Sequence, residues 1–235
     1  PSDGVDAPSR DDLKFIERLL VAPLVDAAQL SRRGIAPELA DANNPAELSE
    51  RLDTIVMRIA HRADLIGFDL FAMSECVAGA SCWVLADRRR PSARSWGTLV
   101  VRPSGDPELA IEIPRPQRAM GTRRLGLDLW ASSQAQTLIL AGADGPADGF
   151  NADPALRGNH LTPFQAMHQG LEAAQRAPSM VLQVRGVAAW RPIGAQVVVG
   201  MGRPVASAEE LPRRVPELFE DGGPLDWIRS WIVAD

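Results

Sequence analysis

The chain has 235 residues, of which 46% are hydrophobic and 23% are charged, and its formal net charge is -5 at pH 7. These values are typical of a soluble globular domain that is long enough to bury a full core. The acidic balance argues against a nucleic-acid partner, because proteins that follow a phosphate backbone usually show a basic face. No apolar run reaches the roughly 18 residues of a membrane span, so no span is expected in this segment.

The N-terminal part of the chain is predicted to be helical. Apolar residues recur at helical spacing from Leu13 to Leu20, and Pro23 predicts a break or a kink. A second helix is expected to begin with Pro45 at its first position and to end at Gly67. These helices are expected to pack on a main domain that follows them.

The pattern then changes to strands. Three short apolar runs without intervening helices predict an antiparallel or mixed edge of a sheet. These runs are residues 68–73, 82–85 and 97–101. From Leu109 onward strands alternate with helices, which predicts parallel pairing. We therefore expect an α/β fold with a mixed, mostly parallel sheet flanked by helices, in a hydrolase-like three-layer architecture. Residues 1–66 would be its N-terminal helical segment and residues 67–235 its α/β domain.

Two helices are expected between the later strands. Thr122 is predicted to cap the first of them. The second begins at Thr162, where a proline follows the cap and Gln165 stands at the third helical position. The segment 142–161 before this helix is long and rich in glycine, proline and alanine. Loops of this length in compact domains are usually functional or mobile.

The polar residues that end or follow the three parallel strands are the candidates for a binding site. Parallel strands bring their carboxyl ends to one edge of the sheet, and open α/β sheets bind ligands at that edge. The first strand supplies Glu112 and Arg115, the second is followed by Asp144, Asn159 and His160, and the third is followed by Arg185.

The chemistry of these residues leaves more than one interpretation open. Two arginines that converge, here Arg115 and Arg185, would form a fork for a carboxylate or a phosphate. A carboxylate beside a histidine can transfer protons or hold a metal. Glu112 is costly in an apolar strand unless it is paired, so it is either catalytic or the buried partner of an arginine. His160 is either functional or packs on the following helix, and His168 is expected to pack on the apolar face of that helix.

Cys76 and Cys82 are the only cysteines of the chain. The small residues between them would let a tight loop close as a disulfide. A disulfide would indicate an oxidising compartment such as a bacterial periplasm, whereas two free thiols would be compatible with the cytoplasm. A structural zinc site is not expected, because a second pair of ligands is missing.

Several familiar signatures are absent from the sequence. The chain has no phosphate-binding Gly-x-x-x-x-Gly-Lys-Ser/Thr motif and no Gly-x-Gly-x-x-Gly motif after a strand. It also lacks a Gly-x-Ser-x-Gly elbow and a His-Glu-x-x-His motif. The sequence therefore does not predict a nucleotide site, a serine nucleophile of the α/β-hydrolase type or a zincin.

Residues 97–220 resemble a divergent member of the zinc carboxypeptidase-like amidohydrolase group. The motifs that carry the resemblance are Glu-Ile-Pro-Arg-Pro at 112–116, Ala-Gly-Ala-Asp at 141–144, Gly-Asn-His at 158–160 and Leu-Gln-Val-Arg-Gly at 182–186. The resemblance implies a mixed sheet with metal ligands on the loops at the carboxyl ends of its strands. It also implies histidines where this chain has Arg115, Asp144 and Arg185, so that only His160 remains. A guanidinium is a permanent cation and cannot ligate zinc, so the resemblance implies that metal and hydrolytic activity are lost.

The sequence thus predicts a degenerate hydrolase-like domain that binds an anion without catalysis and without a cofactor. Its ligand would be an acidic small molecule, peptide or polymer, bound by Arg115, Asp144, Asn159, His160 and Arg185. One alternative is an active metal-dependent amidohydrolase or peptidase, with Glu112 and His160 as catalytic residues and Glu112, Asp144 and His160 as zinc ligands. Another is a structural module of a larger bacterial assembly, with the N-terminal helices docked on another protein.

Overall fold

The computed structural model describes residues 7–32, 45–77, 79–88, 96–117, 121–143, 146–147, 150–151, 153–154, 159, 161–175, 180–186, 197–199 and 232–234. The chain forms two compact units, Pro1–Gly186 and Val187–Asp235. The N-terminal helices therefore belong to the same unit as the main sheet. In the second unit, β9 (Val197–Val199) and β10 (Ile232–Ala234) pair in parallel.

A six-stranded sheet forms the centre of the first unit, in the order β1-β2-β3-β5-β4-β8. Its strands are β1 (Phe68–Val77), β2 (Ala80–Asp87), β3 (Thr98–Val101), β4 (Asp106–Ile113), β5 (Ala135–Leu140) and β8 (Met180–Gln183). Pairing is antiparallel from β1 through β2 and β3 to β5, and parallel between β4 and each of β5 and β8. The α/β class and the mixed sheet are thus confirmed.

The expectation of a mostly parallel sheet is not confirmed, because antiparallel pairing extends to the pair β3–β5. Strand β5 inserts between β3 and β4, which are consecutive in the chain, and so it has an antiparallel neighbour on one side and a parallel neighbour on the other. The apolar run of β5 shows that both faces of the strand are buried, but it carries no information about the direction of its neighbours. Between β5 and the next helix, β6 (Pro146–Ala147) and β7 (Phe150–Asn151) form a small antiparallel pair.

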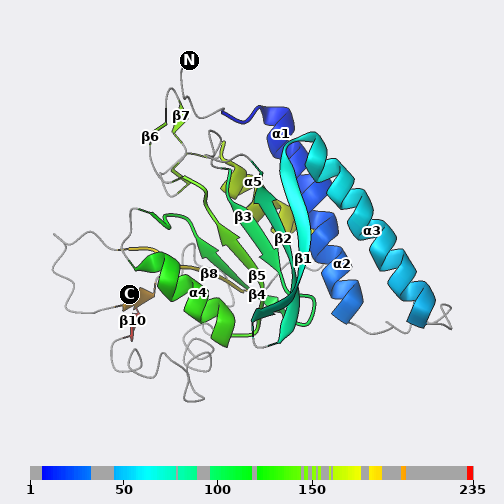
Figure 1. Ribbon diagram of the computed structural model, residues 1–235. Coiled ribbons are helices and arrows are strands. Elements are labelled where there is room, and N and C mark those ends of the chain that lie inside the picture. The colour runs from blue at the N-terminus through cyan, green and yellow to red at the C-terminus, as the bar shows by residue number, and fades with distance from the viewer. Residues whose placement is uncertain are drawn as a thin grey trace. The chain divides into compact units, whose positions relative to one another are not determined.

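Helices cover both faces of the sheet (Figure 1). The first helical run consists of α1 (Arg10–Phe15), the π-helical η1 (Ile16–Val21) and α2 (Ala22–Arg32), and α3 (Pro45–Leu65) packs on β1. Helix α5 (Pro163–Ala173) packs on η1 and β5, whereas α4 (Thr122–Ser132) packs on β4 and β5. Gly126 of α4 lies against Ile113, and the neighbouring Glu112 meets His168 of α5. Because successive residues of a strand face opposite sides, α4 and α5 cover opposite faces of the sheet.

The N-terminal helical run confirms the predicted helix but not a break at Pro23. The chain stays helical through Pro23, and the π-helical segment η1 ends two residues before it. A proline cannot donate a backbone hydrogen bond, and a π-helical segment is a local irregularity of the kind that long helices adopt at such positions. Ile16, Leu20 and Leu24 of this run are fully buried in the core between the helices and the sheet.

The two predicted caps have different outcomes. The hydroxyl of Thr162 accepts a hydrogen bond from the backbone N–H of Gln165 at 3.1 Å, which confirms this cap. The predicted cap at Thr122 is wrong, because Gly121, with a φ of 84°, occupies the cap position and has no side chain to offer. Thr122 is the first residue inside α4, and its hydroxyl donates to the backbone carbonyl of Arg115 at 3.1 Å.

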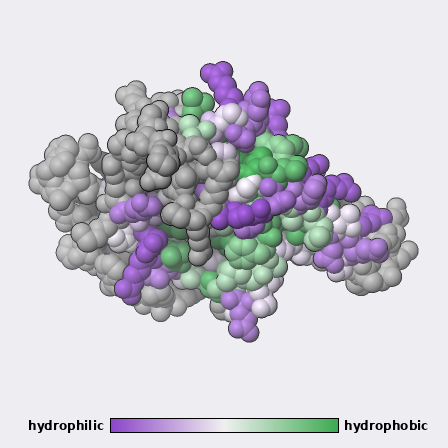
Figure 2. Space-filling model, turned by 45° about the horizontal axis from the view of Figure 1, so that its top comes forward, coloured by the Kyte–Doolittle hydropathy of each residue, from purple (hydrophilic) through white to green (hydrophobic). Residues whose placement is uncertain are grey.

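The surface of the described residues is mixed in character. Figure 2 shows hydrophobic and hydrophilic groups beside each other on the face that it presents. Large apolar side chains are exposed on α3, at Met57 and Leu65, and on β1, at Phe71 and Met73. In the described part of the chain, no helix combines the length and the apolar character needed to cross a membrane.

Candidate functional site

Glu112, the next-to-last residue of β4, is completely buried, and both of its carboxylate oxygens form hydrogen bonds. Its Oε1 lies 2.7 Å from Nδ1 of His168, and its Oε2 accepts a hydrogen bond from Nε2 of Gln183 at 2.6 Å. An ionised carboxylate only accepts hydrogen bonds, so Nδ1 of His168 is the nitrogen that carries the proton in this pair. The buried carboxylate is thus paired, as its position requires, but with a histidine and an amide instead of an arginine.

His168 is more than the packing residue that the helical pattern predicts. The hydrogen bond to Glu112 raises the pKa of His168, burial opposes this rise, and the charges of Glu112 and Glu172 add to it. Its Nε2 lies 3.4 Å from the carboxylate of Glu172, one turn further along α5. The imidazole is 20% exposed and connects the buried Glu112 to the exposed Glu172.

We expect the pair to make stability depend on pH. The pKa of His168 is raised in the folded state above its ordinary value of 6.5, so folding favours the protonated form. Its contribution to the free energy of unfolding is complete below that ordinary value and is lost as the pH rises through the raised folded-state value. Urea unfolding of the wild type and of His168→Gln should therefore differ more at about pH 6 than at about pH 9. A difference that stays constant over this range would contradict the pairing.

Arg185 follows β8 and is held by a neutral side chain. Its Nε and Nη2 donate to Oε1 of Gln183 at 3.0 and 2.5 Å. Gln183 therefore links the exposed guanidinium to the buried Glu112. Among the described residues, no carboxylate forms an ion pair with Arg185. We call Glu112, His168, Gln183 and Arg185 the Glu112 cluster.

Arg115 follows β4 and is held by a carboxylate. Its Nε and Nη2 donate to the two carboxylate oxygens of Asp153, at 3.0 and 2.7 Å. The backbone carbonyl of Asp153 accepts a hydrogen bond from Nδ2 of Asn159 at 2.9 Å. The three residues Arg115, Asp153 and Asn159 form the Arg115 cluster. Asp153 is absent from the site that the sequence predicts, because nothing distinguishes it there from the other acidic residues of the segment 142–161.

The structure brings together some of the predicted residues and leaves others apart. Arg115 and Asn159 meet at Asp153, and the amide of Gln117 donates to the carbonyl of Gly142 at 2.9 Å, so the segments after β4 and β5 converge. Arg115 and Arg185 each belong to a separate cluster at the ends of neighbouring strands. Asp144 and His160 lie outside the described residues.

The described residues offer limited support for a metal centre. Of the alternative zinc ligands Glu112, Asp144 and His160, only Glu112 is described, and protein groups already occupy both of its oxygens. Within the described part of the chain, no group of three or more histidine, cysteine, aspartate or glutamate side chains is arranged to hold a metal ion.

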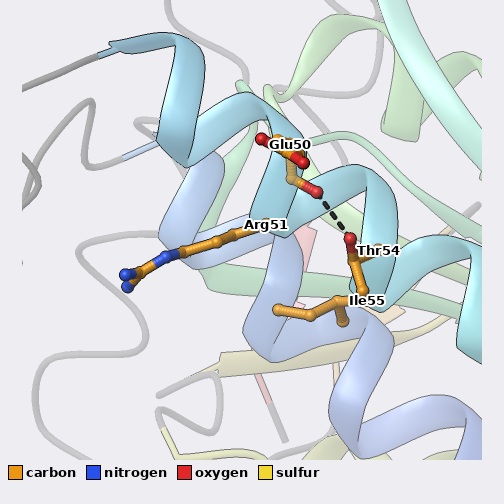
Figure 3. Close-up of a pocket in the computed structure, with 4 residues that line it drawn as sticks. All are labelled: Glu50, Arg51, Thr54 and Ile55. Carbon is orange, nitrogen blue, oxygen red and sulfur yellow. Dashed lines mark hydrogen bonds between the residues drawn. The ribbon is translucent and has the colours of Figure 1, made fainter.

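A surface hollow lies elsewhere, on α3 (Figure 3). Its described lining residues are Glu50, Arg51, Thr54 and Ile55. The hydroxyl of Thr54 donates to the backbone carbonyl of Glu50 at 2.8 Å, so this hydroxyl is used within the helix. Helix α3 packs on β1, and β1 and β8 are the two opposite edge strands of the sheet. The hollow is therefore not part of either cluster.

Cys76 and Cys82 are free thiols in the structure, the first half-buried and the second buried.

No family model matches the chain, and neither a curated protein nor a solved structure matches it significantly. The resemblance to zinc carboxypeptidase-like amidohydrolases therefore stays a prediction.

Proposed function

We propose that the first unit is a non-catalytic domain of hydrolase-like architecture that binds a small anion at the carboxyl ends of β4 and β8. The observation that carries the proposal is the way Arg185 is held. Its guanidinium is exposed, yet two hydrogen bonds to Gln183 fix its orientation, and Gln183 is itself anchored on Glu112. An oriented guanidinium is suited to a carboxylate or a phosphate, and less conformational freedom is lost when the anion binds.

The charges around Arg185 support an anionic ligand. Glu112 is paired with His168, and Arg115 is paired with Asp153. Gln183 is neutral, so the positive charge of Arg185 stays available at the end of the strand. Arg115, which is 37% exposed, would therefore support the neighbouring strand end instead of forming the second arm of a clamp.

The surroundings of Glu112 favour binding over catalysis. A general base must lie within hydrogen-bonding distance of the proton that it removes from a substrate. Glu112 is completely buried, and its two oxygens are bonded to His168 and Gln183. Its role in the proposal is to hold Gln183, and through it Arg185, in place.

Replacing Arg185 with alanine should weaken the binding of inorganic phosphate and of citrate by about tenfold or more. Hydrogen bonds to charged groups contribute roughly 1.5–3 kcal/mol, and tenfold corresponds to about 1.4 kcal/mol. The measurement is a titration followed by NMR shifts of the backbone amides of residues 183–186. The matched control is Arg58→Ala, which removes an exposed arginine from α3 at the other end of the sheet. Equal affinities of the two variants, or no saturable shift in the wild type, would overturn the proposal.

A further inference from the structure

A buried arginine lies on the face of the sheet that α4 covers. Arg102 follows β3 and is 2% exposed. Its Nη2 donates to the backbone carbonyl of Trp130 in α4 at 2.7 Å, and its guanidinium carbon stacks 4.3 Å from the centre of the Trp130 ring. Trp83 of β2 pairs with Val101 of β3, and the two strands are antiparallel. Cys82, one residue before Trp83, is therefore the cross-strand neighbour of Arg102, one residue after Val101.

The charge of Arg102 has no carboxylate partner among the described residues. Its hydrogen bonds go to the Trp130 carbonyl and, at 3.4 Å, to the amide oxygen of Gln134. Within the described part of the chain, the Nε of Arg102 has no hydrogen-bond partner, and neither has the buried amide nitrogen of Gln136. A buried cation is costly unless an anion compensates it. Burial lowers the pKa of Arg102, and the neighbouring Cys82 and Cys76 oppose this shift.

The β1–β2 hairpin brings these two thiols together. Met73 pairs with Cys82 and Val77 with Ala80, and the register shifts between these pairs. The irregular segment that results carries Cys76 close enough to Cys82 to affect the pKa of its thiol. Burial and Cys76 raise the pKa of Cys82 to about 12, while Arg102 acts in the opposite direction. Cys76 is thus the more accessible thiol, and Cys82 is the buried thiol beside the cation.

We propose that Cys76 and Cys82 are a redox-active pair that closes into a disulfide by exchange with a low-molecular-weight disulfide, and that Arg102 is the positioning residue that stabilises the Cys82 thiolate during closure. Cys76 is half-buried and can meet a reagent from solution, whereas Cys82 is buried with a raised pKa, so the formation of its thiolate depends on the charge of the neighbouring Arg102. The site lies on the α4 face of the sheet, whereas the Glu112 cluster lies on the α5 face, so the pair is independent of the proposed anion site.

The reaction proceeds by two exchanges. The Cys76 thiol loses its proton to solvent, and its sulfur attacks one sulfur of the reagent, whose disulfide bond breaks and releases one thiolate. The Cys82 thiol then loses its proton, and its sulfur attacks Cys76, which releases the second thiolate. The protein loses two electrons and two protons, and the reagent disulfide gains the two electrons and becomes two thiols after protonation.

The experiment uses the full chain, reduced and then incubated with oxidised glutathione. Intact mass and peptide mapping should show the loss of two hydrogen atoms and a bridge between Cys76 and Cys82. In Cys82→Ser, the reaction should stop at a mixed disulfide of glutathione with Cys76. A wild-type protein that stays reduced, or that keeps glutathione on either cysteine without closing the bridge, would overturn the proposal.

The role of Arg102 is tested by the rate at which the mixed disulfide closes. An opposite charge nearby shifts a pKa by about one unit or more, and one unit changes the thiolate fraction about tenfold. Arg102→Met should therefore slow closure about tenfold and accumulate the mixed disulfide, and Arg102→Lys should restore most of the rate. Arg124→Met, which removes an exposed arginine from α4, is the control. If Arg102→Met does not keep the wild-type circular dichroism, Arg102→Gln takes its place. If the disulfide closes at the wild-type rate in the variant that lacks the Arg102 charge, Arg102 does not stabilise the Cys82 thiolate.

Discussion

Replacing Glu112 with leucine is expected to lower the free energy of unfolding by about 3–5 kcal/mol, the usual cost of removing one partner from a buried charged pair. The leucine has nearly the same length as the glutamate but cannot accept a hydrogen bond. It therefore leaves Nδ1 of His168 and Nε2 of Gln183 without the acceptor that each has in the wild type. Urea unfolding at about pH 6, where His168 is protonated, measures the loss.

The double variant Glu112→Leu/His168→Leu separates the charged pair from the packing around it. Replacing both members of a buried pair by apolar groups is often neutral or stabilising, because no charge is left uncompensated. We therefore expect the double variant to be more stable than Glu112→Leu alone. If the double variant loses the sum of the two single losses, the two residues do not interact. If Glu112→Leu alone costs less than about 1 kcal/mol, the carboxylate is not the anchor that we describe.

Replacing Gly170 with alanine should destabilise the protein by about 1–3 kcal/mol, the usual cost of overpacking, although the same change in an open helix would stabilise it by about 1 kcal/mol. A Cβ on Gly170 of α5 would lie 2.7 Å from the backbone carbonyl oxygen of Glu17 and 2.7 Å from Cβ of Val21. Both atoms belong to η1, so α5 and the π-helical segment would have to move apart. Urea unfolding gives the sign of the change.

Gly126→Ala provides a matched comparison for Gly170→Ala. Its added Cβ would meet Cδ1 and Cγ1 of Ile113, which are side-chain atoms that can move to another rotamer. Gly126→Ala should therefore cost less than Gly170→Ala. A Gly170→Ala variant as stable as the wild type would show that α5 and η1 are not held as closely as the structure describes.

The local patterns of the sequence predict most elements of the fold but not how the strands are paired. The register of Thr162, its following proline and Gln165 predicts the start of α5 because a cap depends only on neighbouring residues. The same reasoning fails at Thr122, because Gly121 adopts a left-handed conformation and the threonine hydroxyl turns to the carbonyl of Arg115. The antiparallel neighbour of β5 could not be predicted, because the direction of pairing depends on segments that are distant in the chain.

In the candidate site, too, the sequence shows which residue needs a partner but not which distant residue supplies it. The sequence identifies Glu112 as a carboxylate that needs a partner, since it lies within an apolar strand. The sequence offers Arg115 and Arg185 as partners if Glu112 is not catalytic, because an arginine is the usual partner of a buried carboxylate. The partners in the structure are instead His168 and Gln183, which are 56 and 71 positions away. His168 could have been recognised as a partner only from the crossing of α5 over β4. Asp153, the partner of Arg115, is likewise identified only by the folded chain.

The order of the strands has a consequence for how the sheet assembles. β3 and β4 are joined by a short turn, yet β5, which comes later in the chain, lies between them. Neighbouring strands are about 4.8 Å apart, so β3 and β4 lie roughly 9.6 Å apart with β5 between them. A chain in which β5 is not inserted would leave β3 with an unpaired edge, and an unpaired edge is open to strand exchange with a second chain. The single strand β5 therefore joins the antiparallel part of the sheet to its parallel part.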